Sequence, residues 1–119
     1  MPEATRNILT ALPKPSGQEI FETLAALPGA RIERIISHGQ STPDGQWYDQ
    51  AWDEWVLVLS GRAELQIETE ASPRVLATGD YLLLPAGCRH RVAWTDPAQA
   101  TVWLAIHFNT PNLVPNSGE

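Results

Sequence analysis

Glu54 and His90 are the two residues of this chain whose types and surroundings could do chemistry together. Glu54 precedes the apolar run 56–59, and His90 follows a turn that contains Pro85 and Gly87. A carboxylate and an imidazole that arrive from two different strands make half of a transition-metal site. The alternative is a buried polar pair whose members are hydrogen-bonded to each other or to the backbone. The sequence leaves both interpretations open.

Three further residues could complete a metal site. His107 lies near the end of an apolar run, where strand alternation places it on one face with Trp103 and Ala105. Asp49 or Gln50, a few residues before the glutamate, would add an oxygen donor. Such a mixed set of nitrogen and oxygen ligands would suit Fe, Mn, Ni or Zn, and the sequence does not choose among them. Equally, His107 could be an ordinary hydrogen-bonded strand histidine, and Asp49 could cap a turn or pair with an arginine.

Short β-rich runs must position these residues. They lie at 55–59, 63–67, 81–84, 92–94 and 102–106, after isoleucines at positions 32, 35 and 36. Within the run 62–68 every second residue is apolar, which predicts Ala63, Leu65 and Ile67 inward and a wet outer face. Turn residues such as Ser60-Gly61 separate the runs. This close spacing of strands and turns favours a sandwich or barrel over βαβ units.

One helix is predicted near the start of the chain. Ser16 and Glu19 have the spacing of a capping box, apolar residues follow as far as Leu27, and Pro28-Gly29 would end the helix. We expect it to lie across the outside of the sheets. The domain organisation predicted is an arm with this helix at residues 1–30, a barrel at 31–108 and a C-terminal tail at 109–119.

Two segments of the chain resemble the two motifs of the cupin family. Glu54 and Gly61 are separated by six residues, as at the end of the family's first motif. The segment 79–90 has a glycine, five residues, Pro-x-Gly, two residues and His90, which is the whole of the second motif. The resemblance covers about residues 31–108. It implies an all-β fold, a double-stranded β-helix or jelly-roll barrel that holds a metal ion or small ligand inside.

The chain departs from the family where the first motif has a His-x-His pair. Those positions fall on Trp47 and Asp49, or on Tyr48 and Gln50 with the shorter spacing, and neither supplies an imidazole. The family's usual site of three histidines and one glutamate is therefore incomplete. The chain also looks like a group of short bacterial cupins of unassigned activity, so that closer resemblance names no reaction.

Composition limits the partners of the protein. The formal net charge is −6, Lys14 is the only lysine, and the seven arginines are scattered, so nucleic acids and anionic membranes are poor partners. The single cysteine, Cys88, excludes an internal disulfide. No apolar run approaches the roughly 20 residues of a membrane span, and the first residues lack the order of a secretory signal, which predicts a cytoplasmic protein. We expect a homodimer, because edge strands and many aromatic residues gain from being covered.

Two functional hypotheses follow. The first is a metal-dependent enzyme that acts on a small molecule by oxygenation, isomerisation or a related step. The second is a metal-free protein that binds or senses a small metabolite without catalysis. Neither a nucleophile elbow nor a phosphate-binding loop is present in the sequence, which disfavours acyl and phosphoryl transfer.

Overall fold

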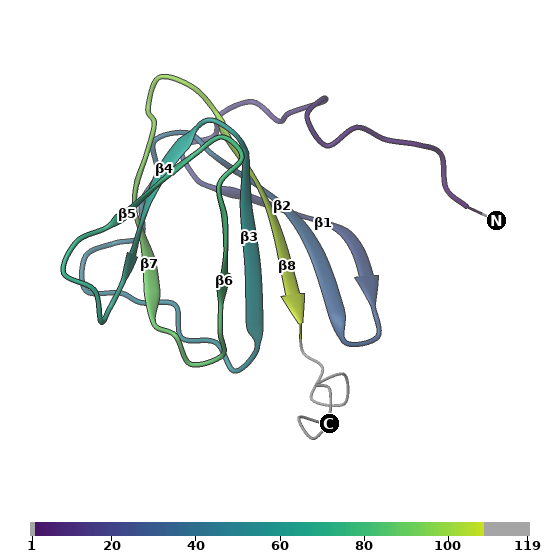
Figure 1. Ribbon diagram of the computed structural model, residues 1–119. Helices are drawn as coiled ribbons and strands as arrows, with labels where there is room; N and C mark the ends of the chain where they lie inside the picture. The colour runs from purple at the N-terminus through teal and green to yellow at the C-terminus, as the bar shows by residue number, and fades with distance from the viewer. Residues whose placement is uncertain (1, 109–119) are drawn as a thin grey trace.

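The protein is built from two antiparallel β-sheets that face each other (Figure 1), and the computed structural model describes residues 2–108. One sheet has the strand order β1-β2-β8-β3-β6 and the other the order β5-β4-β7. The strands are β1 (Ile20–Leu27), β2 (Ala30–Ser37), β3 (Asp53–Ser60), β4 (Arg62–Ile67), β5 (Arg74–Ala77), β6 (Tyr81–Leu84), β7 (His90–Thr95) and β8 (Thr101–Phe108). The prediction of an all-β fold is confirmed. Within residues 2–108 there is no helix, and so none that could cross a membrane.

The predicted N-terminal helix is wrong, because the segment forms β1 instead. β1 pairs with β2 from Ile20 opposite Ile36 to Leu27 opposite Ala30. Pro28-Gly29 is the two-residue turn of this hairpin, since proline followed by a glycine of positive φ (77°) is the signature of a type II turn. Six of the eight residues of β1 are apolar and they do not alternate, so the local pattern does not mark a strand. Pairing with β2 is what makes the segment a strand.

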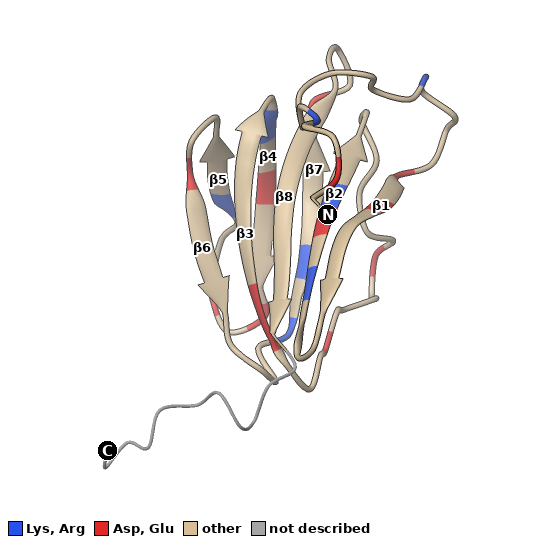
Figure 2. Cartoon of the chain, turned by 90° about the vertical axis from the view of Figure 1, so that its right-hand side faces the viewer, with Lys and Arg blue, Asp and Glu red and all other residues tan. Residues whose placement is uncertain are grey.

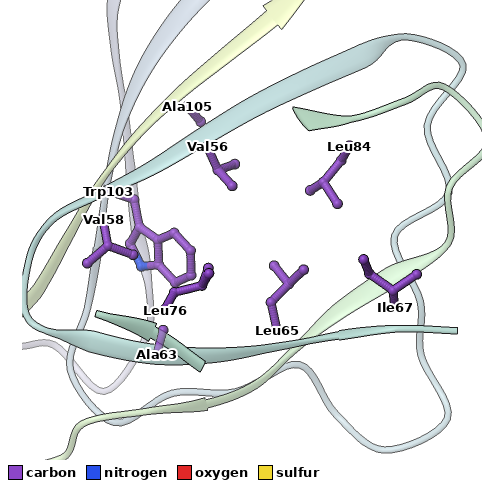
Figure 3. Packing of buried hydrophobic residues seen from close by; sticks show 9 residues of the cluster. All are labelled: Val56, Val58, Ala63, Leu65, Ile67, Leu76, Leu84, Trp103 and Ala105. Carbon is purple, nitrogen blue, oxygen red and sulfur yellow. The ribbon is translucent and has the colours of Figure 1, made fainter. Parts of the chain in front are cut away.

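Side chains from the two sheets meet in one apolar core (Figure 3). The larger sheet contributes Val56, Val58, Leu84, Trp103 and Ala105, and the smaller sheet contributes Ala63, Leu65, Ile67 and Leu76. The inward face predicted for residues 62–68 is therefore confirmed. Some of these core residues also line a cavity with buried polar side chains, and the candidate site lies there.

Arg34 is a buried cation on β2 that ties the N-terminal segment to the barrel. Its guanidinium pairs with Glu22 of β1 at an N···O distance of 2.6 Å. It also donates hydrogen bonds to the backbone carbonyls of Ile8 (3.0 Å), Thr10 (2.9 Å) and Ala11 (3.4 Å). A buried charge is tolerated only when it is paired and hydrogen-bonded, and Arg34 meets both conditions. The outer face of β2 is thereby covered by the chain that precedes the sheet, which passes in front of this strand in Figure 2.

Substituting Arg34→Met should lower the free energy of unfolding by about 2–4 kcal/mol, because it leaves three carbonyls and Glu22 without their donor. Chemical denaturation measures the loss. The matched control is Arg74→Met, which removes an exposed arginine paired with Glu70 at 2.6 Å and should have little effect. Equal losses in the two variants would contradict the anchoring role of Arg34.

Candidate functional site

A cavity of about 210 Å³ lies between the sheets. Its polar lining consists mainly of carboxylates and aromatic or imidazole rings: Glu19, Glu33, Glu54, Tyr48, His90 and His107. Drug-sized ligand pockets usually measure about 300–1,000 Å³, so this space suits a smaller molecule. The rest of the lining is largely apolar and includes core residues such as Val56, Leu65 and Trp103.

Strand register brings Glu54, His107 and Arg31 onto one face of the larger sheet. His107 of β8 is directly opposite Glu54 of β3 on one side and Arg31 of β2 on the other. Residues directly opposite each other in an antiparallel pair project from the same face of the sheet. Glu54 and His107 are 7% and 6% exposed. The inward face predicted for His107, shared with Trp103 and Ala105, is thus observed.

His90 reaches the cavity because the loop before β7 is fastened to the segment before β3. The amide of Gly87 donates to the Gln50 carbonyl (2.8 Å), and the amide of Ala86 donates to a carboxylate oxygen of Asp53 (2.8 Å). His90 and Tyr48 then exchange two backbone hydrogen bonds, and their rings stack with centroids 5.5 Å apart. The two motifs recognised in the sequence are therefore joined directly.

The side chains of His90 and Glu54 face each other. Nε2 of His90 lies 3.7 Å from Oε1 of Glu54, and Nδ1 of His90 lies 2.9 Å from the carbonyl oxygen of Cys88. Burial disfavours the imidazolium form, but the Glu54 carboxylate and the Cys88 carbonyl outweigh it and raise the pKa of His90 above its ordinary value. The pair can therefore hold and release one proton inside the cavity.

His107 has different partners. Its Nδ1 accepts a hydrogen bond from the indole N–H of Trp52 (2.9 Å), and its Nε2 lies 3.0 Å from Oε1 of Glu33. The same Nε2 is 4.0 Å from Oε2 of Glu54. Glu33 also lies 3.6 Å from the Arg31 guanidinium. Both ring nitrogens of His107 are thus engaged by neighbouring side chains.

The carboxylates make the interior of the cavity electronegative. Glu19 accepts a hydrogen bond from the Ser37 hydroxyl, and burial raises the pKa of the Glu19 carboxyl. Burial, followed by the charges of Glu19, Glu54 and Glu33, also raises the pKa of the Tyr48 hydroxyl. Three carboxylates act on one phenol because all of them border the same small space.

Four of the five residues predicted as ligands from the sequence line this cavity, and one does not. Glu54, His90, His107 and Gln50 are in its wall, whereas the side chain of Asp49 is 58% exposed and lies 3.9 Å from Arg89. Of the two motif registers, the structure turns Tyr48 and Gln50 toward the cavity. Whether any of them ligates a metal stays a prediction.

Glu33 and Trp52 are site residues that the sequence did not predict. β2 is buried on both faces, so alternation of apolar residues does not single out the cavity face, which Glu33 shares with Ile35. The spacing of Glu33 and Arg31 by two residues was the available signal, because it places both on one side of a strand. For Trp52, nothing in the sequence indicates its hydrogen bond to His107.

The side chains as arranged do not fit a divalent metal. Metal-bound imidazole must offer an unprotonated nitrogen, and both nitrogens of His107 already have partners. Across residues 2–108 no group of three or more histidine, cysteine, aspartate or glutamate side chains is arranged to hold a metal ion. His90 and Glu54 alone would leave such an ion with two protein ligands.

The fold and the cavity define a small jelly-roll protein with a buried carboxylate–imidazole site. The family model that matches is "Cupin domain", over residues 34–107, and the chain belongs to this family. No curated protein matches the chain.

Solved structures agree with the assignment to the family. The chain is similar to a "putative mannose-6-phosphate isomerase" from Ralstonia eutropha JMP134, with 48% identity, a TM-score of 0.86, and 90% of this chain and 99% of that one covered. It is also similar to a cupin superfamily protein from Desulfitobacterium hafniense DCB-2, with 19% identity, a TM-score of 0.71, and 90% and 93% of the two chains covered. A protein from Thermus thermophilus matches with 15% identity, a TM-score of 0.74, and 88% and 96% covered. The latter two similarities concern the fold alone.

Proposed function

We propose that the protein is a metal-independent isomerase that moves a proton within a small hydroxy-carbonyl compound. The observation that carries the proposal is the buried pair of His90 Nε2 and Glu54 Oε1, 3.7 Å apart in the wall of the cavity between the sheets. A general acid and a general base on one side of a small ligand are what such a reaction requires. The similarity to the Ralstonia protein, whose name includes an isomerase, supports this class of reaction.

In the proposed reaction Glu54 takes a proton from the carbon next to the substrate carbonyl. The imidazolium of His90 gives a proton to the carbonyl oxygen, so an enediol forms and no net charge is left on the substrate. In the second step Glu54 gives its proton to the former carbonyl carbon, and the neutral His90 takes the proton of the other hydroxyl group, which completes the isomerisation and restores both side chains. No oxidant or reductant takes part. The raised pKa of His90 favours the imidazolium that the first step needs.

The charges of the cavity indicate an uncharged substrate. Glu19, Glu33 and Glu54 line the interior, whereas Arg31 is the only lysine or arginine that residues 2–108 contribute to the lining. Arg31 is itself 3.6 Å from Glu33 and its side chain is 44% exposed. A phosphate group deep in the cavity would meet carboxylates, and a favourable position exists only beside Arg31. We therefore expect neutral hydroxyaldehydes and hydroxyketones to bind better than their phosphate esters.

The test is exchange of substrate hydrogen with D₂O. Neutral hydroxyaldehydes and hydroxyketones of three to six carbons are incubated with the protein in D₂O that contains a chelator, and NMR follows deuterium at the carbon next to the carbonyl. We expect catalysed exchange that the chelator leaves intact. Exchange that appears only after a divalent metal is added would instead support the metal-dependent hypothesis.

Thermal stabilisation by the same compounds tests the second hypothesis, a binding or sensing role without catalysis. A ligand at one hundred times its dissociation constant should add about 2.7 kcal/mol to the free energy of unfolding. Stabilisation without deuterium exchange would contradict the isomerase and leave a metabolite-binding cupin. The absence of both effects across the panel would reject the proposed substrate class.

A further inference from the structure

The two histidines of the cavity have hydrogen-bond partners that can act in only one direction. The indole N–H of Trp52 is a donor and never an acceptor, so Nδ1 of His107, 2.9 Å away, must present its lone pair. The backbone carbonyl of Cys88 is an acceptor and never a donor, so Nδ1 of His90, also 2.9 Å away, must carry a proton. Nδ1 is therefore a hydrogen-bond acceptor in His107 and a hydrogen-bond donor in His90.

These partners determine whether the second ring nitrogen, Nε2, of each neutral imidazole carries a proton or a lone pair. A neutral His107 without a proton on Nδ1 must have one on Nε2, which it donates to Oε1 of Glu33 at 3.0 Å. A neutral His90 with a proton on Nδ1 has a lone pair on Nε2, which faces Glu54. The cavity thus holds one imidazole donor and one imidazole acceptor.

We infer that Trp52 is a positioning residue that fixes His107 as the Nε2–H tautomer. In this tautomer His107 is a hydrogen-bond donor in the cavity, and it cannot serve as a metal ligand through Nε2. The inference rests on the proposed function only in taking this cavity as the ligand site. The tautomers themselves are properties of the free protein. They can be measured without substrate, so the two proposals can fail separately.

Geometry opposes the other tautomer of His107. A metal bound at Nε2 would require a proton on Nδ1, and that proton would point at the indole N–H of Trp52. Two donors would then face each other at a His107 side chain that is 6% exposed, and neither would have an acceptor in that direction. Glu33 would lose its donor at the same time. Binding a metal through His107 therefore breaks two hydrogen bonds before any ligand bond forms.

The experiment compares wild type with Trp52→Phe by long-range ¹H–¹⁵N NMR of the histidine rings, recorded on the alkaline side of the His90 titration. In the wild type we expect the Nε2–H pattern for His107 and the Nδ1–H pattern for His90. In Trp52→Phe the His107 signals should move toward the Nδ1–H pattern or an average of the two, with His90 unchanged. Trp94→Phe is the matched control, since Trp94 is 37% exposed, lies outside the cavity and should leave both patterns as they are.

Zinc titration by calorimetry gives a second measurement on the same proteins. Because the indole no longer opposes the metal-binding tautomer, Trp52→Phe should bind Zn²⁺ at least about ten-fold more tightly than wild type and Trp94→Phe. A wild-type His107 with the Nδ1–H pattern, or a Trp52→Phe spectrum identical to wild type, would overturn the inference. Should Trp52→Phe fail to fold, the wild-type spectrum still decides the tautomer.

Discussion

Substituting Gly61→Ala should destabilise the barrel by about 3–5 kcal/mol, because the added methyl group has no space and the backbone has an unfavourable conformation. Gly61 has φ of +95° in the turn between β3 and β4. A Cβ there would lie 2.6 Å from Cα of Thr101 and 2.7 Å from the carbonyl oxygen of Ala100. Backbone atoms would have to move. The Thr101 hydroxyl also donates to the Arg62 carbonyl (3.1 Å), which holds this contact in place.

Gly79→Ala is the matched control for this prediction. Gly79 has φ of +92°, but nothing lies within 4 Å of a Cβ built there. In this variant the free energy of unfolding should fall only by the cost of placing an alanine at positive φ, about 1–2 kcal/mol. Urea denaturation of both variants measures the difference. Equal losses would mean that the close approach of Gly61 to the turn before β8 contributes nothing to stability.

Much of the fold could be predicted from the sequence because local patterns and tertiary packing agree there. Ala63, Leu65 and Ile67 alternate in the sequence and point into the core. The exception is β1, where Ser16 and Glu19 imitate a helix start. In the structure the Glu19 carboxylate accepts a hydrogen bond from Ser37 at the end of β2, and the strand that follows Glu19 is formed by pairing with β2. The capping-box spacing is a signal within one segment, and it carries no information on pairing with the strand that follows.

The candidate site was predictable where a motif or strand parity fixed the direction of a side chain. Spacing within the two motifs indicated Glu54 and His90, and alternation along the last strand turned His107 inward. Glu33 was missed because β2 is buried on both faces, so hydrophobic alternation does not identify its cavity side. Trp52 was missed because its function depends on one hydrogen bond across 55 residues of sequence. The metal and the homodimer stay predictions.

Substituting Glu54→Gln should remove the proposed proton transfer and reverse the direction of the His90 pKa shift. The amide keeps the shape of the side chain but removes the charge, so deuterium exchange should fall by about 10²–10⁴-fold. In wild type the Glu54 carboxylate contributes to raising the pKa of His90 against the effect of burial. In the variant burial dominates, and the pKa of His90 should fall below its ordinary value near 6.5. An NMR titration of the His90 ring measures this directly.

The shifted pKa of His90 also predicts how the free energy of unfolding depends on pH. In wild type a folded-state pKa above the unfolded one stabilises the protein at pH below about 6.5, and this stabilisation is lost as pH rises through the folded value. Glu54→Gln lacks this stabilisation. The free energy of unfolding of the wild type should therefore exceed that of the variant most on the acidic side of that window and less on the alkaline side. Glu68→Gln, which removes a surface carboxylate paired with Arg89 at 2.8 Å, should leave the His90 titration unchanged. If His90 titrates identically in wild type and Glu54→Gln, the two side chains do not act on each other's protonation. That result would contradict the proposed acid–base pair but not the barrel fold.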